Sequence, residues 1–243
     1  MTASDFDWKP LALVPLLALV TLPLVGSPST WLTLTVAGLA MGMIIFIIAS
    51  GLTLVFGLMD VLNFGHGVFI ALGAFVATSV LGAMGDWTGS AELWRNMVAV
   101  LPAMLVAMAV AGALGLAFER FIVRPVYGQH LKQILITMGG MIIGEELIKV
   151  IWGPQQIPLP LPEGMRGSLL LGDAAIEKYR LVAVGLVVFG VLAWTLSRTK
   201  VGLLIRAGVQ DREMVESLGY RIRRLFVAVF VVGSALAGLG GVM

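Results

Sequence analysis

Long apolar segments recur along this sequence and strongly limit the fold classes open to it. The run from Leu32 to Phe56 carries no charge and is about 25 residues long, enough at a helical rise of 1.5 Å per residue to cross a bilayer at a tilt. Six further runs are predominantly apolar, at residues 11–25, 64–84, 97–118, 131–152, 181–196 and 225–243. We therefore expect an all-helical, polytopic transmembrane bundle of about seven spans.

Composition supports this fold class. The 243 residues are 59% hydrophobic and 12% charged, with a mean hydropathy of +1.00, and one soluble core cannot bury that much apolar surface. The chain is thus expected to lie in membrane lipid. The absence of cysteine excludes disulfides and thiolate metal sites, and a net charge of +2 does not indicate a nucleic-acid partner.

The ends of the chain lead to three expectations. The run at 11–25 is preceded by Asp5 and Asp7 with only Lys9, and no Ala-x-Ala-like cleavage site follows, so we expect an uncleaved first span. We treat residues 1–243 as a single transmembrane domain. The last run reaches Met243 without a polar flank, which predicts that the chain is incomplete, because the terminal carboxylate would lie at the membrane boundary.

The distribution of Lys and Arg predicts the orientation. Residues 119–132 hold three and residues 198–224 hold seven, together ten of the sixteen in the chain. Short connections rich in Lys and Arg stay cytoplasmic, so 198–224 is expected to be a cytoplasmic loop and the proline-rich segment 153–180 a periplasmic one. Counting spans back places the amino terminus inside.

A polar interruption lies between two apolar runs within residues 50–77. Asp60, Asn63 and His66 recur at every third position, a spacing that would put them on one side of a helix. Three glycines are interleaved with them: Gly57, Gly65 and Gly67. We interpret the segment as a break between two spans. Because non-helical backbone in a bilayer must be covered by protein or line water, the break indicates a pathway.

A row of small side chains predicts a helix-packing face. Four of them follow one another at four-residue spacing along the run 97–118: Ala103, Ala107, Ala111 and Gly115. Small residues let helix backbones approach closely in membranes, so we expect another helix to pack on this face.

The segment 197–224 contains a candidate amphipathic helix, Val209 to Leu218, with Met214, Val215 and Leu218 toward one side. Gly219 is placed to cap its carboxyl end. Such a helix can dock in a groove of a soluble partner. The alternative is a solvated loop helix, held to the membrane by three arginines that follow it: Arg221, Arg223 and Arg224.

Three stretches resemble the permease subunits of bacterial branched-chain amino acid ABC transporters, the LivH type. They are GLTLVFGLMDVLNFGHGVFIALGAF at 51–75, FERFIVRPVYG at 118–128 and GLLIRAGVQDREMVESLGY at 202–220. The first matches the family's Asn-Phe-small-His-Gly core between two Gly-rich spans. The third is similar to the family's ATPase-coupling loop, although Gly208 and Gln210 stand where Ala and Glu are frequent. The family also continues beyond the position of Met243.

The resemblance implies a set of partners. These are a second permease subunit of the LivM type, two cytoplasmic ATPases and a periplasmic substrate-binding protein. It also implies a coupling role for one group of residues in the cytoplasmic loop: Arg206, Gln210, Asp211, Glu213, Glu216, Leu218 and Gly219. No G-x-x-x-x-G-K-[ST] phosphate loop occurs in the sequence, so this chain is expected to hold no cofactor and to leave ATP to its partners.

Candidate pathway residues each have a structural alternative. His66 and Asn63 can contact a passing zwitterion or tie two helices together, and Asp60 can line the pathway or be a solvated turn acid. Glu145 and Glu146 lie inside the run 131–152, where a charge is costly. We expect one of them to pair with Lys149, Glu145 having the favourable four-residue spacing, and the other to face protein or water. Glu146 is therefore included among the candidate pathway residues.

The sequence thus predicts an inner-membrane permease that imports branched-chain or other neutral amino acids by alternating access and is not itself an enzyme. A urea or short-chain amide permease remains an alternative within the class. A membrane enzyme using Glu145, Glu146 and His66 is the alternative from another class. The two histidines and the absence of H-E-x-x-H do not indicate a metal site.

Overall fold

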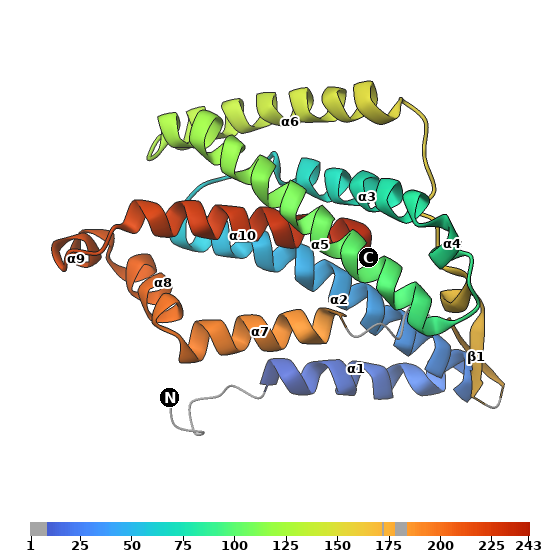
Figure 1. Cartoon of the computed structure of the whole chain (residues 1–243). Coiled ribbons are helices and arrows are strands. Elements are labelled where there is room, and N and C mark those ends of the chain that lie inside the picture. The colour runs from blue at the N-terminus through green and yellow to red at the C-terminus, as the bar shows by residue number, and fades with distance from the viewer. Residues whose placement is uncertain (1–8, 172, 178–183) are drawn as a thin grey trace. The chain divides into compact units, whose positions relative to one another are not determined.

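The computed structural model describes residues 9–171, 173–177 and 184–243, and most of them are helical (Figure 1). The long helices are α1 (Lys9–Val25), α2 (Pro28–Met59), α3 (His66–Ala83), α5 (Leu93–Phe118), α6 (His130–Trp152), α7 (Val184–Arg198), α8 (Lys200–Gln210) and α10 (Ile222–Val242). The short elements are α4 (Gly85–Thr88), the π-helical turn η2 (Glu119–Val123), the 3-10 turns η3 (Arg124–Val126) and η4 (Glu163–Met165), α9 (Arg212–Ser217), and the strands β1 (Ser168–Leu171) and β2 (Ala174–Glu177).

Four helical segments in the described residues are long and apolar enough to cross a membrane: α2, α3, residues 93–126 and α10. A fifth results if α7 and α8, bent by 73° at their junction, form one broken span. Helix α6 is long enough but is not counted among these spans, because it carries four charged side chains: Lys132, Glu145, Glu146 and Lys149. The helical, polytopic class is confirmed, while seven spans remain a prediction.

The described residues form two compact units, one within residues 1–42 and 165–182 and the other within residues 43–164 and 183–243. In the first, the indole Nε1 of Trp31 donates to the carbonyl of Ala18 at 2.8 Å and joins α2 to α1. The first unit also contains an antiparallel hairpin in which Ser168 of β1 is opposite Glu177 of β2. This hairpin lies within the expected loop 153–180, in which residues 172 and 178–180 lie outside the described part.

In the second unit, α10 packs against α2, α3 and α5 through small residues. The predicted packing face of α5 is confirmed, because Ala103, Ala107, Ala111 and Gly115 are all buried. A Cβ atom added at Gly238 of α10 would lie 3.1 Å from the carbonyl oxygen of Ala107. Gly115 likewise faces Ser234 without room for a larger side chain. The close approach of the helices explains why glycine is required at these two positions.

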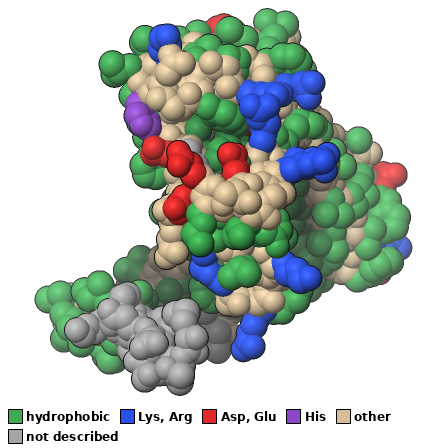
Figure 2. All heavy atoms as spheres, turned by 90° about the vertical axis from the view of Figure 1, so that its left-hand side faces the viewer, with side chains coloured by type: hydrophobic (Ala, Val, Ile, Leu, Met, Phe, Trp, Pro, Cys, Tyr) green, Lys and Arg blue, Asp and Glu red, His purple; other side chains and the backbone are tan. Residues whose placement is uncertain are grey.

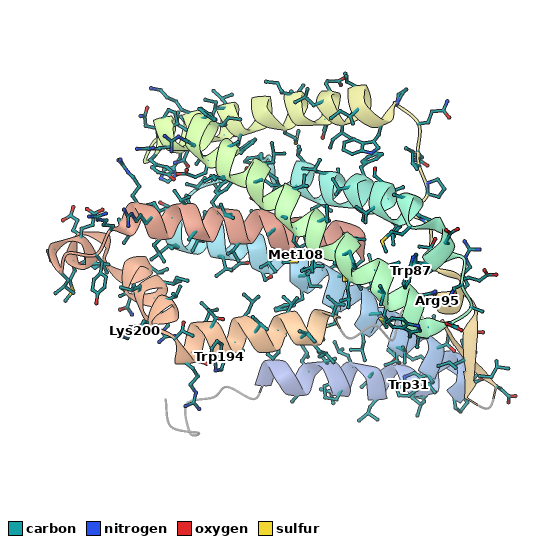
Figure 3. All side chains as sticks on the ribbon, viewed as in Figure 1. Trp31, Trp87, Arg95, Met108, Trp194 and Lys200 are labelled. Atoms are coloured by element: carbon teal, nitrogen blue, oxygen red, sulfur yellow. The ribbon has the colours of Figure 1, made fainter. Side chains whose placement is uncertain are left out.

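The end of α5 that carries Arg95 and the short helix α4 with Trp87 lie away from α9 (Figure 3). This end is organised by Asn96, which is fully buried. Its Nδ2 donates to the carbonyl of Ser90 at 2.8 Å, and its Oδ1 accepts from the backbone N–H of Gly164 at 2.7 Å. One side chain therefore ties the connection after α4 to the loop that follows α6.

Candidate functional site

The predicted break is present between α2, which ends at Met59, and α3, which begins at His66. Asp60 has a φ of +53°, the single positive value at a non-glycine residue in the described part of the chain. Its backbone N–H still donates to the carbonyl of Phe56 at 2.9 Å, so Asp60 ends α2 in a left-handed conformation. Of the interleaved glycines only Gly65 lies in the break, because Gly57 and Gly67 belong to the flanking helices.

The three polar residues of the break do not share one environment. Asn63 and His66 are buried, each 6% exposed, whereas Asp60 is exposed. The Asp60 carboxylate lies 3.6 Å from Nε2 of His130 at the start of α6, outside the buried part of the break. The His66 ring hydrogen bonds through Nε2 to the carbonyl of Ile48 at 3.2 Å and so links α3 back to α2.

Helix α6 carries two buried polar side chains that are not among the predicted site residues, and one of them, Thr137, contacts the break. Thr137 and Gln133 are both fully buried. The Thr137 hydroxyl accepts from the backbone N–H of Phe64 at 3.3 Å and lies 3.3 Å from the carbonyl of Leu62. Thr137 therefore contacts the residues on either side of Asn63. Four-residue spacing of two polar residues in an apolar run was the available signal.

Glu146 lies apart from these residues. It is exposed and pairs with Lys149 at 2.6 Å, so the expected Lys149 pair forms with Glu146 and not with Glu145. Glu146 is nine residues beyond Thr137, roughly 13 Å along the helix. The structure does not bring it to the break, and a pathway role for Glu146 remains a prediction.

An aromatic cluster lies beneath the break. The ring of Phe118 at the end of α5 is 5.6 Å from that of Phe69 and 6.2 Å from that of Phe230. A Cβ atom added at Gly65 would lie 2.6 Å from the Phe118 ring, so glycine allows the backbone of the break to pack directly against the cluster. The break therefore rests on a rigid apolar base formed by three helices.

The expected single helix from Val209 to Leu218 is wrong. Helix α8 ends at Gln210, and Asp211 is extended, with φ −153° and ψ 105°. The Asp211 carboxylate accepts from the backbone N–H of Met214 at 2.9 Å and starts the separate helix α9. Aspartate favours this cap because its oxygen satisfies a free N–H of the first turn, which outweighs continuation of the helix.

Gly219 caps α9 as predicted, with a φ of +84°. Its N–H donates to the carbonyl of Glu216 at 2.9 Å, and the N–H of Tyr220 donates to the carbonyl of Val215 at 3.3 Å. These two bonds form a Schellman motif. Upstream, the Arg206 guanidinium donates to the carbonyl of Leu196, so it fixes the bend between α7 and α8.

The side chains of α9 divide into one buried anchor and an exposed set. Val215 is buried, whereas Met214 and Leu218 are 60% and 66% exposed, which corrects the expectation that the three share one side. Val215 belongs to the same apolar cluster as Leu58, Met59 and Val61, which flank Asp60. The short helix and the break are therefore joined through one packed core.

Charged side chains gather on the end of the molecule that carries α9 (Figure 2). The connection 119–132 contributes to this end with a buried carboxylate, Glu119, which accepts a short hydrogen bond from the Tyr127 hydroxyl. Burial, and then the bond to Glu119, raise the pKa of Tyr127.

A surface hollow of about 630 Å³ lies beside α9. It is lined by Glu216, Tyr220, Arg221, Ile222, Arg223, Arg224 and Val227.

Comparison with known protein families identifies the family to which this chain belongs. Residues 34–243 match the family described as the permease component of the branched-chain amino acid transport system. The chain belongs to this permease family. The resemblance read from the three motifs is confirmed. The permease is a multi-pass membrane protein, of the inner membrane in bacteria, and its relatives are transport components and not enzymes.

Individual relatives agree with the family match. The permease is 29% identical to the high-affinity branched-chain amino acid transport system permease protein BraD of Pseudomonas aeruginosa, over 86% of this chain and 68% of the relative. It is 28% identical to the high-affinity branched-chain amino acid transport system permease protein LivH of Escherichia coli, over 85% of this chain and 68% of the relative. A probable LivH of Methanocaldococcus jannaschii is 22% identical over 82% and 61%. No solved structure matches the permease.

Proposed function

We propose that this chain forms the translocation pathway of an ATP-driven importer for branched-chain or other neutral amino acids. It would act by alternating access with a second, LivM-like permease subunit. Two cytoplasmic ATPases would hydrolyse ATP, with no cofactor in this chain, and a periplasmic binding protein would deliver the substrate. The amino terminus would be cytoplasmic.

One observation carries this proposal: Val215 of α9 is buried in the same apolar cluster as Leu58, Met59 and Val61 beside the break. Packed cores move as units and do not deform continuously. A displacement of α9 would therefore be transmitted to the end of α2 and to the break. Gly208 of α8 adds a second contact, since a Cβ atom there would lie 3.1 Å from the Leu58 side chain.

The exposed side of α9 fits a docking role. Met214 and Leu218 present apolar anchors, and Glu213 and Glu216 are exposed beside them. A short helix with apolar anchors and a charged rim is suited to a groove on a soluble ATPase. The other residues of the coupling set support its shape: Arg206 and Gln210 belong to α8, Asp211 starts α9, and Gly219 ends it.

The break supplies the candidate pathway. Asn63 and His66 provide neutral polar groups inside an apolar bundle, and Asp60 lies at its exposed edge. Intramembrane polar groups of this kind commonly contact a transported solute. Glu146, exposed on α6, belongs to the pathway only if another subunit covers it.

The test is uptake by the chain reconstituted in vesicles with its partner subunits. We expect ATP-dependent uptake of labelled leucine and none of labelled urea; the reverse result would replace amino acids by urea as the substrate. Val215→Ala is expected to lower the leucine imported per ATP several-fold, because truncating the anchor loosens the connection. Val209→Ala is the matched control, because Val209 on α8 is 52% exposed. Equal coupling in both variants would contradict the proposed route.

A further inference from the structure

Four buried polar atoms around the break have no hydrogen-bond partner within the described residues. They are Nδ2 and Oδ1 of Asn63, Nδ1 of His66 and Oε1 of Gln133. The three side chains are at most 6% exposed. Buried polar atoms without partners are costly, and native structures contain few of them. Three of the atoms belong to the break and the first turn of α3, and the fourth belongs to α6, whose Thr137 bonds to the break. Unpaired polar atoms on two packed segments indicate a polar ligand between them.

The hydrogen-bond role of each atom follows from its neighbours. A carbonyl oxygen only accepts, so the His66 Nε2 facing the carbonyl of Ile48 carries the ring proton, and Nδ1 of the neutral ring is an acceptor. Similarly, the Gln133 amide nitrogen donates to the carbonyl of Val126 at 3.2 Å, which identifies the remaining atom as Oε1. The free set is therefore three acceptors and one donor.

The residues that carry these atoms are linked through short hydrogen-bonded steps between the break and α6. The N–H of His66 donates to the backbone carbonyl of Asn63 at 3.4 Å, which makes these two residues one turn. Thr137 bonds to the residues flanking Asn63 and also to the backbone carbonyl of Gln133, at 2.7 Å. Gln133 is thus one helical turn from the hydroxyl that holds the break.

We propose that Asn63, His66 and Gln133 form a binding site for the ammonium group of a zwitterionic solute. An ammonium group carries three N–H donors and no acceptor, which matches the three free acceptors. The Asn63 Nδ2 remains as a donor for the carboxylate of the same solute. The inference rests on the proposed function, which supplies the pathway, and adds Gln133 and the chemical group that the site recognises.

The first experiment uses three ligands on the full chain purified in mild detergent. L-leucine carries both charged groups, isoamylamine keeps the ammonium group alone, and isocaproate keeps the carboxylate alone. We expect leucine and isoamylamine to raise the thermal unfolding midpoint with concentration and isocaproate to leave it unchanged. Equal effects of isoamylamine and isocaproate, or no effect of any ligand, would overturn the site.

The second experiment uses two variants of Gln133. Gln133→Leu is expected to abolish the response to isoamylamine, because it removes the unpaired acceptor Oε1. It also removes the Nε2 bond to the carbonyl of Val126, so its midpoint without ligand is compared with that of the second variant, which keeps the acceptor. Gln133→Glu keeps acceptor oxygens and is expected to retain the response. Gln129→Leu is the matched control, since Gln129 is exposed one turn earlier. A Gln133→Leu chain that is destabilised and still responds to isoamylamine would show a purely structural glutamine.

Leucine uptake separates this inference from the proposed function. In vesicles with the partner subunits, Gln133→Leu is expected to lower uptake at least about tenfold at equal protein, the effect of losing one hydrogen bond to a charged group. Leucine uptake by the unmodified chain without any response to isoamylamine would contradict the ammonium site and support the importer. A response to isoamylamine without leucine uptake would support the ammonium site and contradict the importer.

Discussion

The backbones of Gly51 in α2 and Gly233 in α10 are in direct contact: a Cβ atom added at Gly233 would lie 2.7 Å from the carbonyl oxygen of Gly51. Neither helix can turn or slide at this point without moving the other. Helix α2 leads into the break and α10 follows the capped helix α9. This contact therefore joins the two parts of the chain that the proposed mechanism requires to move together.

Gly233→Ala is expected to destabilise the bundle by about 1–3 kcal/mol, because overpacking a close contact forces backbone shifts. Gly57→Ala is the control: Gly57 lies in α2, and a Cβ atom there would meet nothing within 4 Å. The measurement is the thermal unfolding midpoint of both purified variants. Equal midpoints for the two variants would mean that the α2–α10 contact is looser than described.

Thr137→Val is expected to cost about 1–2 kcal/mol and to lower transport, because it removes the hydroxyl that bonds to the N–H of Phe64 and leaves that group unpaired. Thr137→Ser should restore both quantities. In the control Thr78→Val, the lost hydroxyl bonds only to the carbonyl of Ala74 in its own helix. Unfolding and leucine uptake are measured in parallel. A harmless Thr137→Val would show that the break holds its shape without α6.

Asp60 offers a test between a backbone role and a charge role. Because its φ is +53°, Asp60→Gly and Asp60→Asn should keep the unfolding midpoint, and Asp60→Val should lower it, since β-branched residues rarely adopt this conformation. Leucine uptake by the same variants then reports on the charge. Full leucine uptake by Asp60→Asn would show that the Asp60 charge has no role in the pathway. Loss of uptake at an unchanged unfolding midpoint would support Asp60 as a pathway residue.

Charge reversal at Glu213 or Glu216, by substitution with Lys, is expected to lower association with the ATPases without reducing membrane insertion. Both carboxylates are exposed on α9 and are free to contact a partner. Charged groups at the rim of an interface mainly affect the association rate, so the loss should depend on salt. Co-purification of the ATPases at two ionic strengths is the measurement. Unchanged co-purification would contradict docking through α9.

The sequence by itself determined the elements whose signal is local. Apolar runs predicted the helices to within a few residues, the four-residue row from Ala103 to Gly115 predicted a buried face, and Gly219 predicted a cap. The change from apolar to polar residues near Asp60 predicted the break. In each case a short stretch of chain carries the whole physical cause, either hydrophobicity, side-chain size or backbone freedom.

Only the tertiary structure decided which distant residues meet. Thr137 lies more than seventy residues from the break in sequence and reaches it because α6 packs there. Val215 is buried while its neighbour Met214 is exposed, because Val215 belongs to the apolar cluster that includes the end of α2. The pairing of Lys149 with Glu146 and not Glu145 likewise depends on side-chain geometry on the folded helix. Packing between segments far apart in sequence sets burial and hydrogen-bond partners, and no local pattern contains that information.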